Sequence, residues 1–159
     1  MIEEYKPKHF FDVLSFILDN VNNDFFITEN NERVVIRDSK TLKRLIKQSS
    51  RMYVDIDSGD VRGIIALWRG LGSKRFFVKL NCADTKSANR LVTMVVWNDN
   101  KDLYIKIKKD SDCVKVFREK KFDFFGNRGN EILLRNDNTG RSINEYSDKD
   151  TQFKTGQFS

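Results

Sequence analysis

The sequence contains few of the residues that build metal or redox sites. It has one histidine, His9, and two cysteines, Cys82 and Cys113, among 159 residues. A single histidine cannot build a histidine-based metal site, and the cysteine spacing matches no metal or redox motif. We therefore expect no bound metal, two small, buried, unpaired thiols and a reducing intracellular environment.

Long hydrophobic runs and a secretion signal are also missing. No apolar run approaches the ~18 residues needed to cross a bilayer. The first residues, MIEEYKPKHFF, are acidic and then aromatic, unlike a signal peptide. These features predict an intracellular protein without membrane association. The length favours one domain with a substantial core.

Basic charge is concentrated in the middle of the chain. The net charge is +6, and residues 62–90 carry seven Lys and Arg with a single Asp. Residues 101–121 add eight Lys and Arg with four Asp and Glu. Such a distribution attracts phosphates or an acidic partner, although a solvated basic surface explains it equally well.

The stretch around which the chain is organised is residues 76–97. An apolar run at 76–80 predicts a strand, the polar residues 81–86 a loop, and the apolar spacing of 88–97 a buried helix. Such a loop directs the first free N–H groups of the helix toward whatever lies within it. A turn of this kind is a natural anion site.

The remaining pattern predicts alternating helices and strands. Helices are expected over residues 8–21, 40–49 and from about 112 to 120, and strands over 2–5, 52–56, 61–68, 74–82, 103–107, 122–125 and 131–134. Residues 25–28 and 33–36 form either a hairpin or loop. Because a helix connects strands 74–82 and 103–107, we expect those two strands to be parallel.

This order of elements resembles the GNAT superfamily of N-acetyltransferases over residues 2–135. Two pieces carry the likeness: DSGDVRGIIAL, residues 57–67, and VFREKKFDFFGNRGNEILLRN, residues 116–136. The resemblance implies a mixed α/β fold with a twisted, mostly antiparallel sheet of six to seven strands and about four helices. It implies a GNAT-like domain at 1–136 and a polar tail at 137–159 that orders only against a partner.

The resemblance also identifies where acetyl-CoA would bind. The residues that would contact it are Leu80, Cys82, Lys86, Ser87, Ala88 and Asn89. In the family, a Gln/Arg-x-x-Gly-x-Gly/Ala loop holds the pyrophosphate through backbone N–H groups. Ala88 matches the last position of that motif. Lys86 stands at its first glycine and Ala83 at its Gln/Arg.

A second difference concerns the proton donor. The family's last helix often carries a tyrosine that protonates the departing thiolate, and Phe117 occupies that position here. The glycine that follows in the family corresponds to Lys121. These differences favour a degenerate, noncatalytic GNAT-like protein without a cofactor. In this interpretation it is a structural or interaction component that binds proteins, or copies of itself, through its tail and basic surface.

Two other functions remain open. The composition suits a phage-encoded protein, located in the host cytoplasm or the virion. The alternative is an active acetyl-CoA-dependent N-acetyltransferase, for which Asp55 and Tyr104 are candidate catalytic residues. A third hypothesis is nucleic-acid binding, in which aromatic and basic residues alternate along two strands: Trp68, Arg69, Lys74, Arg75, Phe76, Phe77 and Lys79.

Overall fold

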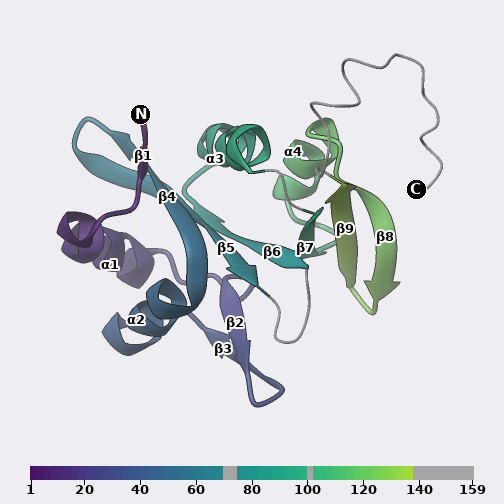
Figure 1. The fold of residues 1–159 in the computed structure, drawn as a ribbon, viewed down its shortest axis with the longest axis horizontal. Coiled ribbons are helices and arrows are strands. Elements are labelled where there is room, and N and C mark those ends of the chain that lie inside the picture. Colours follow the sequence, from purple (N-terminus) through teal and green to yellow (C-terminus); the bar gives the residue numbers. More distant parts are fainter. Residues whose placement is uncertain (70–74, 100–101, 138–159) are drawn as a thin grey trace.

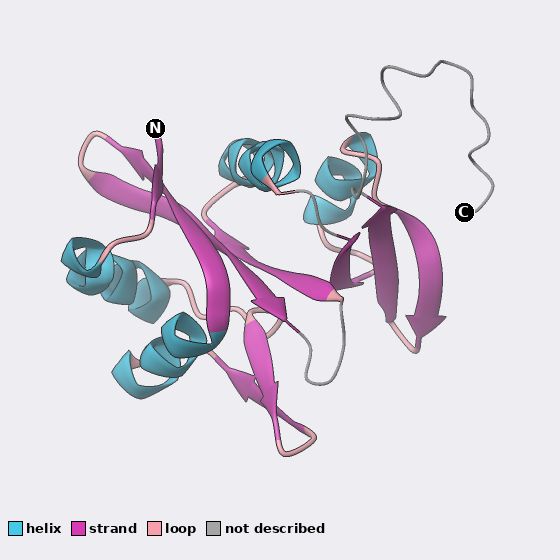
Figure 2. Ribbon diagram, viewed as in Figure 1, coloured by secondary structure: helices cyan, strands magenta, loops and turns pink. Residues whose placement is uncertain are grey.

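The computed structural model describes residues 1–69, 75–99 and 102–137. The predicted tail therefore lies, apart from Asp137, outside the described residues, as does Lys74. Figures 1 and 2 show helices on both sides of one twisted sheet.

The sheet has seven strands. In spatial order these are β1 (Ile2–Glu4), β4 (Ser49–Asp57), β5 (Asp60–Arg69), β6 (Phe76–Cys82), β7 (Asp102–Lys108), β9 (Glu131–Asp137) and β8 (Asp123–Arg128). Every neighbouring pair is antiparallel except β6 and β7, which are parallel. The predicted mixed, mostly antiparallel sheet is confirmed.

Four α-helices cover the sheet in two pairs. They are α1 (Phe10–Asp19), which follows a 3-10 turn at Pro7–His9, α2 (Ser39–Gln48), α3 (Thr85–Asn98) and α4 (Cys113–Glu119). One hydrophobic core forms under α1 and α2, and a second forms between the other side of the sheet and α3 with α4. Across the described ranges, we find no helix with both the length and the apolar character needed to cross a membrane.

A separate hairpin lies between α1 and α2. Its strands are β2 (Phe26–Glu29) and β3 (Glu32–Val35), and Asn30 and Asn31 form the turn with φ of 52° and 65°. Asparagine tolerates this left-handed conformation, which a two-residue hairpin turn requires. The structure thus decides between the two predictions for this segment in favour of the hairpin.

Short-range sequence signals fix several element boundaries. Asp38 caps α2, since its carboxylate accepts the Thr41 N–H at 2.9 Å. The turn between β4 and β5 places Ser58 and Gly59 at φ of 53° and 85°. Both features bound elements that the sequence predicts, the helix at 40–49 and the strands at 52–56 and 61–68.

Helix α3 lies directly against β5 at Gly63. A Cβ at this position would lie 2.6 Å from Ser87 Oγ, 2.9 Å from Leu91 Cδ1 and 3.0 Å from Cys82 Cβ. Only a residue without a side chain allows this approach, so Gly63 sets the distance between the helix and the sheet.

We predict that Gly63→Ala lowers the free energy of unfolding by about 1–3 kcal/mol, because the added methyl group overpacks the contact between α3 and β5. Urea denaturation would measure the loss. Gly126→Ala is the matched control, since its Cβ would meet nothing within 4 Å. Equal effects of the two substitutions would contradict the packing argument.

Candidate functional site

The candidate site is the place where β6 and β7 separate. The two strands pair at Phe76 with Leu103 and at Phe77 with Tyr104, near the first residues of each strand. Beyond these pairs the strands diverge, and α3 begins at the open end of β6 (Figure 1). The opening has one side that faces α3 and α4 and an opposite side that faces the β2–β3 hairpin.

The connection from β6 to α3 is shorter than predicted. We expected a polar loop over residues 81–86, but only Ala83 and Asp84 separate the strand from the helix. Asp84 caps the helix: its Oδ1 accepts the Ser87 N–H at 2.9 Å, and its Oδ2 accepts from Arg62 Nη2 at 2.9 Å. The cap allows the helix to start three residues earlier than the apolar pattern indicates.

Both contacts of Asp84 favour its charged form. The Ser87 N–H and then Arg62 lower the pKa of Asp84 below its usual value. A carboxylate therefore lies at the N-cap of α3, where the helix dipole favours a negative charge. The N–H of Ala83, the other connecting residue, donates to the Arg62 carbonyl at 2.8 Å.

Only two of the six predicted coenzyme contacts are exposed. Lys86 and Asn89 face solvent, whereas Ser87 and Ala88 are completely buried. Leu80 is 8% exposed and belongs to the core under α3, and Cys82 packs against that core. The structure therefore brings the six residues to one corner, but most of their side chains serve packing.

The two cysteines come together across the opening. Cys82 ends β6 and Cys113 begins α4, and both cysteines are free and half-buried. The neighbouring Cys113 thiol and burial raise the pKa of Cys82, so its thiol stays protonated. The two thiols are unpaired, as expected, but they lie close to each other, at the end of β6 and the start of α4.

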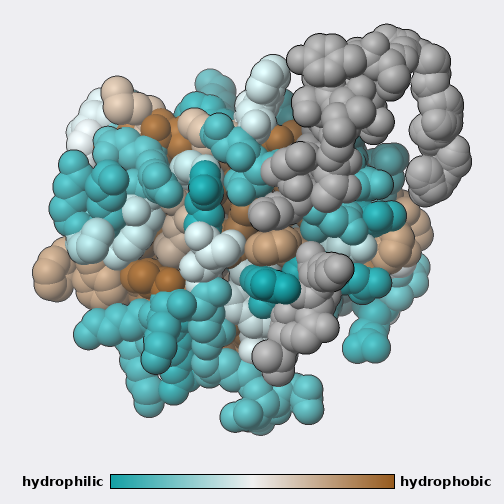
Figure 3. Space-filling model, in the orientation of Figure 1, coloured by the Kyte–Doolittle hydropathy of each residue, from teal (hydrophilic) through white to brown (hydrophobic). Residues whose placement is uncertain are grey.

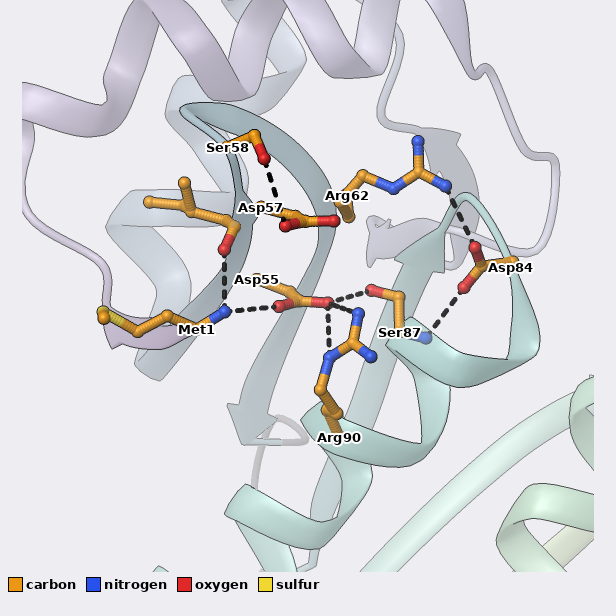
Figure 4. A network of polar contacts seen from close by, with 9 residues as sticks. Met1, Asp55, Asp57, Ser58, Arg62, Asp84, Ser87 and Arg90 are labelled. Carbon is orange, nitrogen blue, oxygen red and sulfur yellow. Dashed lines mark hydrogen bonds and ion pairs between the residues drawn. The ribbon is translucent and has the colours of Figure 1, made fainter.

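Asp55, a predicted catalytic candidate, lies at the centre of a polar network (Figure 4). Its Oδ2 accepts from Ser87 Oγ at 2.7 Å and from Arg90 Nη2 at 2.7 Å and Nε at 3.1 Å. The Met1 amino group lies 3.5 Å from Oδ1. Asp55 is inaccessible to solvent, so these contacts attach β4 to α3.

The charge of Asp55 is stabilised in place. Burial alone raises the pKa of this carboxyl group, but the hydrogen bonds from Arg90 and Ser87 outweigh burial and lower the pKa of Asp55 below its usual value. A buried carboxylate with its oxygens already engaged is suited to holding the helix rather than to accepting a proton from a substrate.

Tyr104, the second catalytic candidate, faces the opposite side of the sheet. Its hydroxyl donates to Asp102 Oδ2 at 3.2 Å. Its ring lies 5.0 Å from the Arg75 guanidinium and 5.8 Å from the Phe77 ring. Burial and the Asp102 charge raise the pKa of Tyr104. The structure therefore does not bring Tyr104 and Asp55 into one site.

The segment around α4 forms the expected helix and following strand, but it lacks the tyrosine that donates a proton in the family. Phe117 is fully buried, and its ring packs edge-on against Phe122 with centroids 5.0 Å apart. A phenyl ring has no proton to donate. Lys121, at the position of the family's glycine, has φ of 69°, a left-handed conformation that favours glycine.

A polar cavity borders the short connection on its outer side. It has a volume of about 300 Å³ and lies between α1, the β4–β5 turn and Ala83. Its lining includes Asp12, Asp19 and Asp60 with Arg62. Three carboxylates make this space unfavourable for phosphate groups. No group of three or more His, Cys, Asp or Glu positioned for a metal occurs within the ranges that the structure describes.

Sequence reasoning did not identify Lys79 as unusual. Its side chain lies on the hairpin side of the opening and is 6% exposed. Its ammonium group contacts the rings of Phe26, Trp68 and Phe77 at 4.2, 5.4 and 5.6 Å. Burial, then Lys106 and Arg33, lower the pKa of Lys79 to about 7. The alternation of side chains along the strand predicts that Lys79 points away from the α3 core. Its contact with Phe26 could not be predicted, because the two residues are far apart in sequence.

Comparisons with known proteins identify the fold. A search against protein-family models and a search against curated proteins give no match. Solved structures do match. A GNAT-family acetyltransferase from Streptococcus pneumoniae aligns with a TM-score of 0.65 and 13% identity over 86% of this chain and 97% of its own.

Two further structures give the same picture. The ribosomal-protein-alanine N-acetyltransferase from Brucella melitensis aligns with a TM-score of 0.65 and 12% identity over 86% of this chain and 98% of its own. The aminoglycoside 6'-N-acetyltransferase from Enterococcus faecium aligns with a TM-score of 0.60 and 11% identity over 86% of this chain and 96% of its own. The chain therefore has the GNAT fold over nearly the full length of these proteins.

The Asp55 network yields a stability prediction. We expect Asp55→Asn to lower the free energy of unfolding at pH 7 by about 2–3 kcal/mol, because charge-assisted hydrogen bonds to Arg90 and Ser87 are weakened. The folded-state pKa is lowered, so the wild-type advantage exists above the unfolded pKa and disappears as pH falls through the folded pKa. Urea denaturation at pH 7 and between pH 4 and 2 would measure this. Asp57→Asn, an exposed neighbour, is the control.

Lys79 should give a pH dependence of the same sign but in a higher pH range. Because its folded pKa is about 7 and its unfolded pKa is near 10.5, the unfolded chain binds an extra proton between these values. Wild-type stability therefore rises from pH 7 to pH 10. We predict that Lys79→Met stabilises by about 1–3 kcal/mol at pH 6, since a buried charge is removed, and that the gain shrinks toward pH 10. Lys86→Met, at an exposed position, should show neither effect.

Proposed function

We propose that this protein uses the GNAT fold as a binding module and does not carry out acetyl-CoA-dependent transfer. The observation that carries the proposal is the Asp84 carboxylate at the N-cap of α3. In the family that the fold resembles, the start of this helix accepts the coenzyme pyrophosphate.

The residues present do not fit that coenzyme. A pyrophosphate at the helix start needs N–H groups that are available and surroundings without negative charge. Here the Ser87 N–H already donates to Asp84, and Arg62 is paired with the same carboxylate. A pyrophosphate would have to displace a group that belongs to the chain and lie beside its charge.

The other parts of the site agree with this interpretation. Cys82 and Cys113 lie close together and pack against the core on the α3 side of the opening. Phe117 supplies no phenol for the departing thiolate. Together these features support a role that does not depend on a thioester in this corner of the fold.

Exposed apolar residues favour a protein-binding role instead. Phe11, Leu18 and Val21, on and just after α1, are 79%, 54% and 53% exposed. Phe11 and Leu18 are seven residues apart and therefore lie on one side of the helix, and Val21 follows its end. Hydrophobic residues reach the surface at the left edge of Figure 3, where α1 lies in Figure 1. An exposed apolar stripe of this kind is typical of an interaction surface.

The direct test is thermal unfolding with and without acetyl-CoA or coenzyme A. We expect no shift at millimolar ligand, whereas a ligand at 100 times its Kd would stabilise by ~2.7 kcal/mol. An active acetyltransferase of the same fold, measured in parallel, shows that the assay detects binding.

Asp84→Ser sharpens this test, because serine retains a capping oxygen and removes the charge. A shift in the wild type that grows in Asp84→Ser would overturn the proposal. That result would place the coenzyme at the start of α3 and favour an active N-acetyltransferase.

A further inference from the structure

The side of the sheet that faces away from α3 and α4 carries a continuous set of rings and cations. Alternate residues of β6 and β7 belong to the core under α3, so Phe77, Lys79, Tyr104 and Lys106 point to the other side. In Figure 1, α3 and α4 lie on one side of β7, β9 and β8, while α1 and α2 lie at the far end beside β4. No described helix covers this part of the sheet on its other side.

Four aromatic rings form a row across this surface. The ring centroids of Trp68 and Phe77 are 6.4 Å apart, those of Phe77 and Tyr104 are 5.8 Å apart, and those of Tyr104 and Phe125 are 5.6 Å apart. They come from β5, β6, β7 and β8. A register shift between Phe124 and Gly126 leaves Phe125 out of the regular pairing of β8. We call the four rings and the cations above them the aromatic–cation face.

The cations of this face lie directly over the rings. Lys106 Nζ is 5.5 Å from the Phe77 ring, and Lys79 Nζ is 5.6 Å from the same ring. The Arg135 guanidinium lies 5.9 Å from Tyr104 and 5.5 Å from Phe125. Arg75 completes the set over Tyr104. Rings and cations therefore alternate in space, although most are distant in sequence.

The face is partly accessible and carries several cations. Tyr104 and Lys79 form its floor, whereas Phe125 is 47% exposed and Lys106 and Arg75 are exposed. Arg135 is paired with Asp102, but within the described part of the chain neither Lys79 nor Lys106 has a carboxylate within ion-pair distance. Lys106 and Arg33 repel the positive charge of Lys79, and a bound anion would reduce this repulsion.

We propose that the aromatic–cation face binds single-stranded nucleic acid. Bases would stack on the exposed ring of Phe125 and on the exposed edge of the half-buried Phe77, while phosphates would pair with Lys106 and its neighbours. A duplex hides the faces of its bases, and an acidic peptide would use the cations without the rings. The combination of both features therefore favours a single strand. This inference concerns the opposite side of the sheet from the coenzyme corner and does not depend on the proposed function.

Fluorescence anisotropy with labelled oligothymidylate and oligouridylate of about 12 nucleotides tests the proposal, since such lengths match known site sizes. We expect binding to both at about 0.1 M salt, and weaker binding to a duplex of equal length and to polyglutamate. Phe125→Leu should weaken binding about 5- to 100-fold through lost stacking. Lys106→Gln should weaken it and reduce the salt slope by about 0.7, the value for one phosphate contact on a single strand.

Matched controls lie on the other side of the molecule. Trp97→Leu removes an 83% exposed aromatic residue of α3, and Lys115→Gln removes an exposed lysine of α4. Neither should change affinity more than about twofold. Thermal unfolding confirms that each variant is folded. Absence of binding, equal losses in face and control variants, or equal affinity for the duplex or polyglutamate would each overturn the proposal. The last outcome would indicate attraction by charge alone.

Discussion

The start of α3 depends on two carboxylates that the chain itself provides. Asp84 satisfies the first turn of the helix, and Asp55 holds the same turn through Ser87 and Arg90. Gly63 allows the helix to approach β5 closely enough for these contacts. The requirement of a helix N-terminus for negative charge is thus met from within the protein. A phosphate ligand would compete with these groups for the same helix turn.

The two sides of the strand opening consequently have different characters. On the α3 side, apolar residues and the Cys82–Cys113 contact join the two halves of the sheet. On the other side, Lys79 and Lys106 lie among aromatic rings. Burying Lys79 there costs stability, which the nearby rings offset in part and which a bound anion would offset further. Packing explains the residues on the α3 side, and the proposed binding role explains the residues on the other side better than packing does.

Local patterns in the sequence were sufficient for most of the fold. Apolar spacing located the helices and strands, and the Ser58-Gly59 turn and the Asp38 cap were readable from a few residues. The start of α3 was misplaced because Asp84 was assigned to a loop, although Asp is a common capping residue. The Cys82–Cys113 contact and the row from Trp68 to Phe125 join segments far apart in the chain. No local pattern could reveal them.

Lys121 shows that the GNAT fold does not require the glycine that the family's motif has at this position. A lysine with φ of 69° pays a conformational cost that glycine avoids. That cost is of order 1 kcal/mol, less than the burial of Phe117 and Phe122 on either side of it contributes. Packing therefore imposes the backbone shape, and the residue identity can vary. The same reasoning applies at Lys86, where a helical turn capped by Asp84 replaces a glycine-rich loop. The shape of this backbone is for this reason weak evidence for coenzyme binding. The contacts of individual side chains are the stronger evidence on that question.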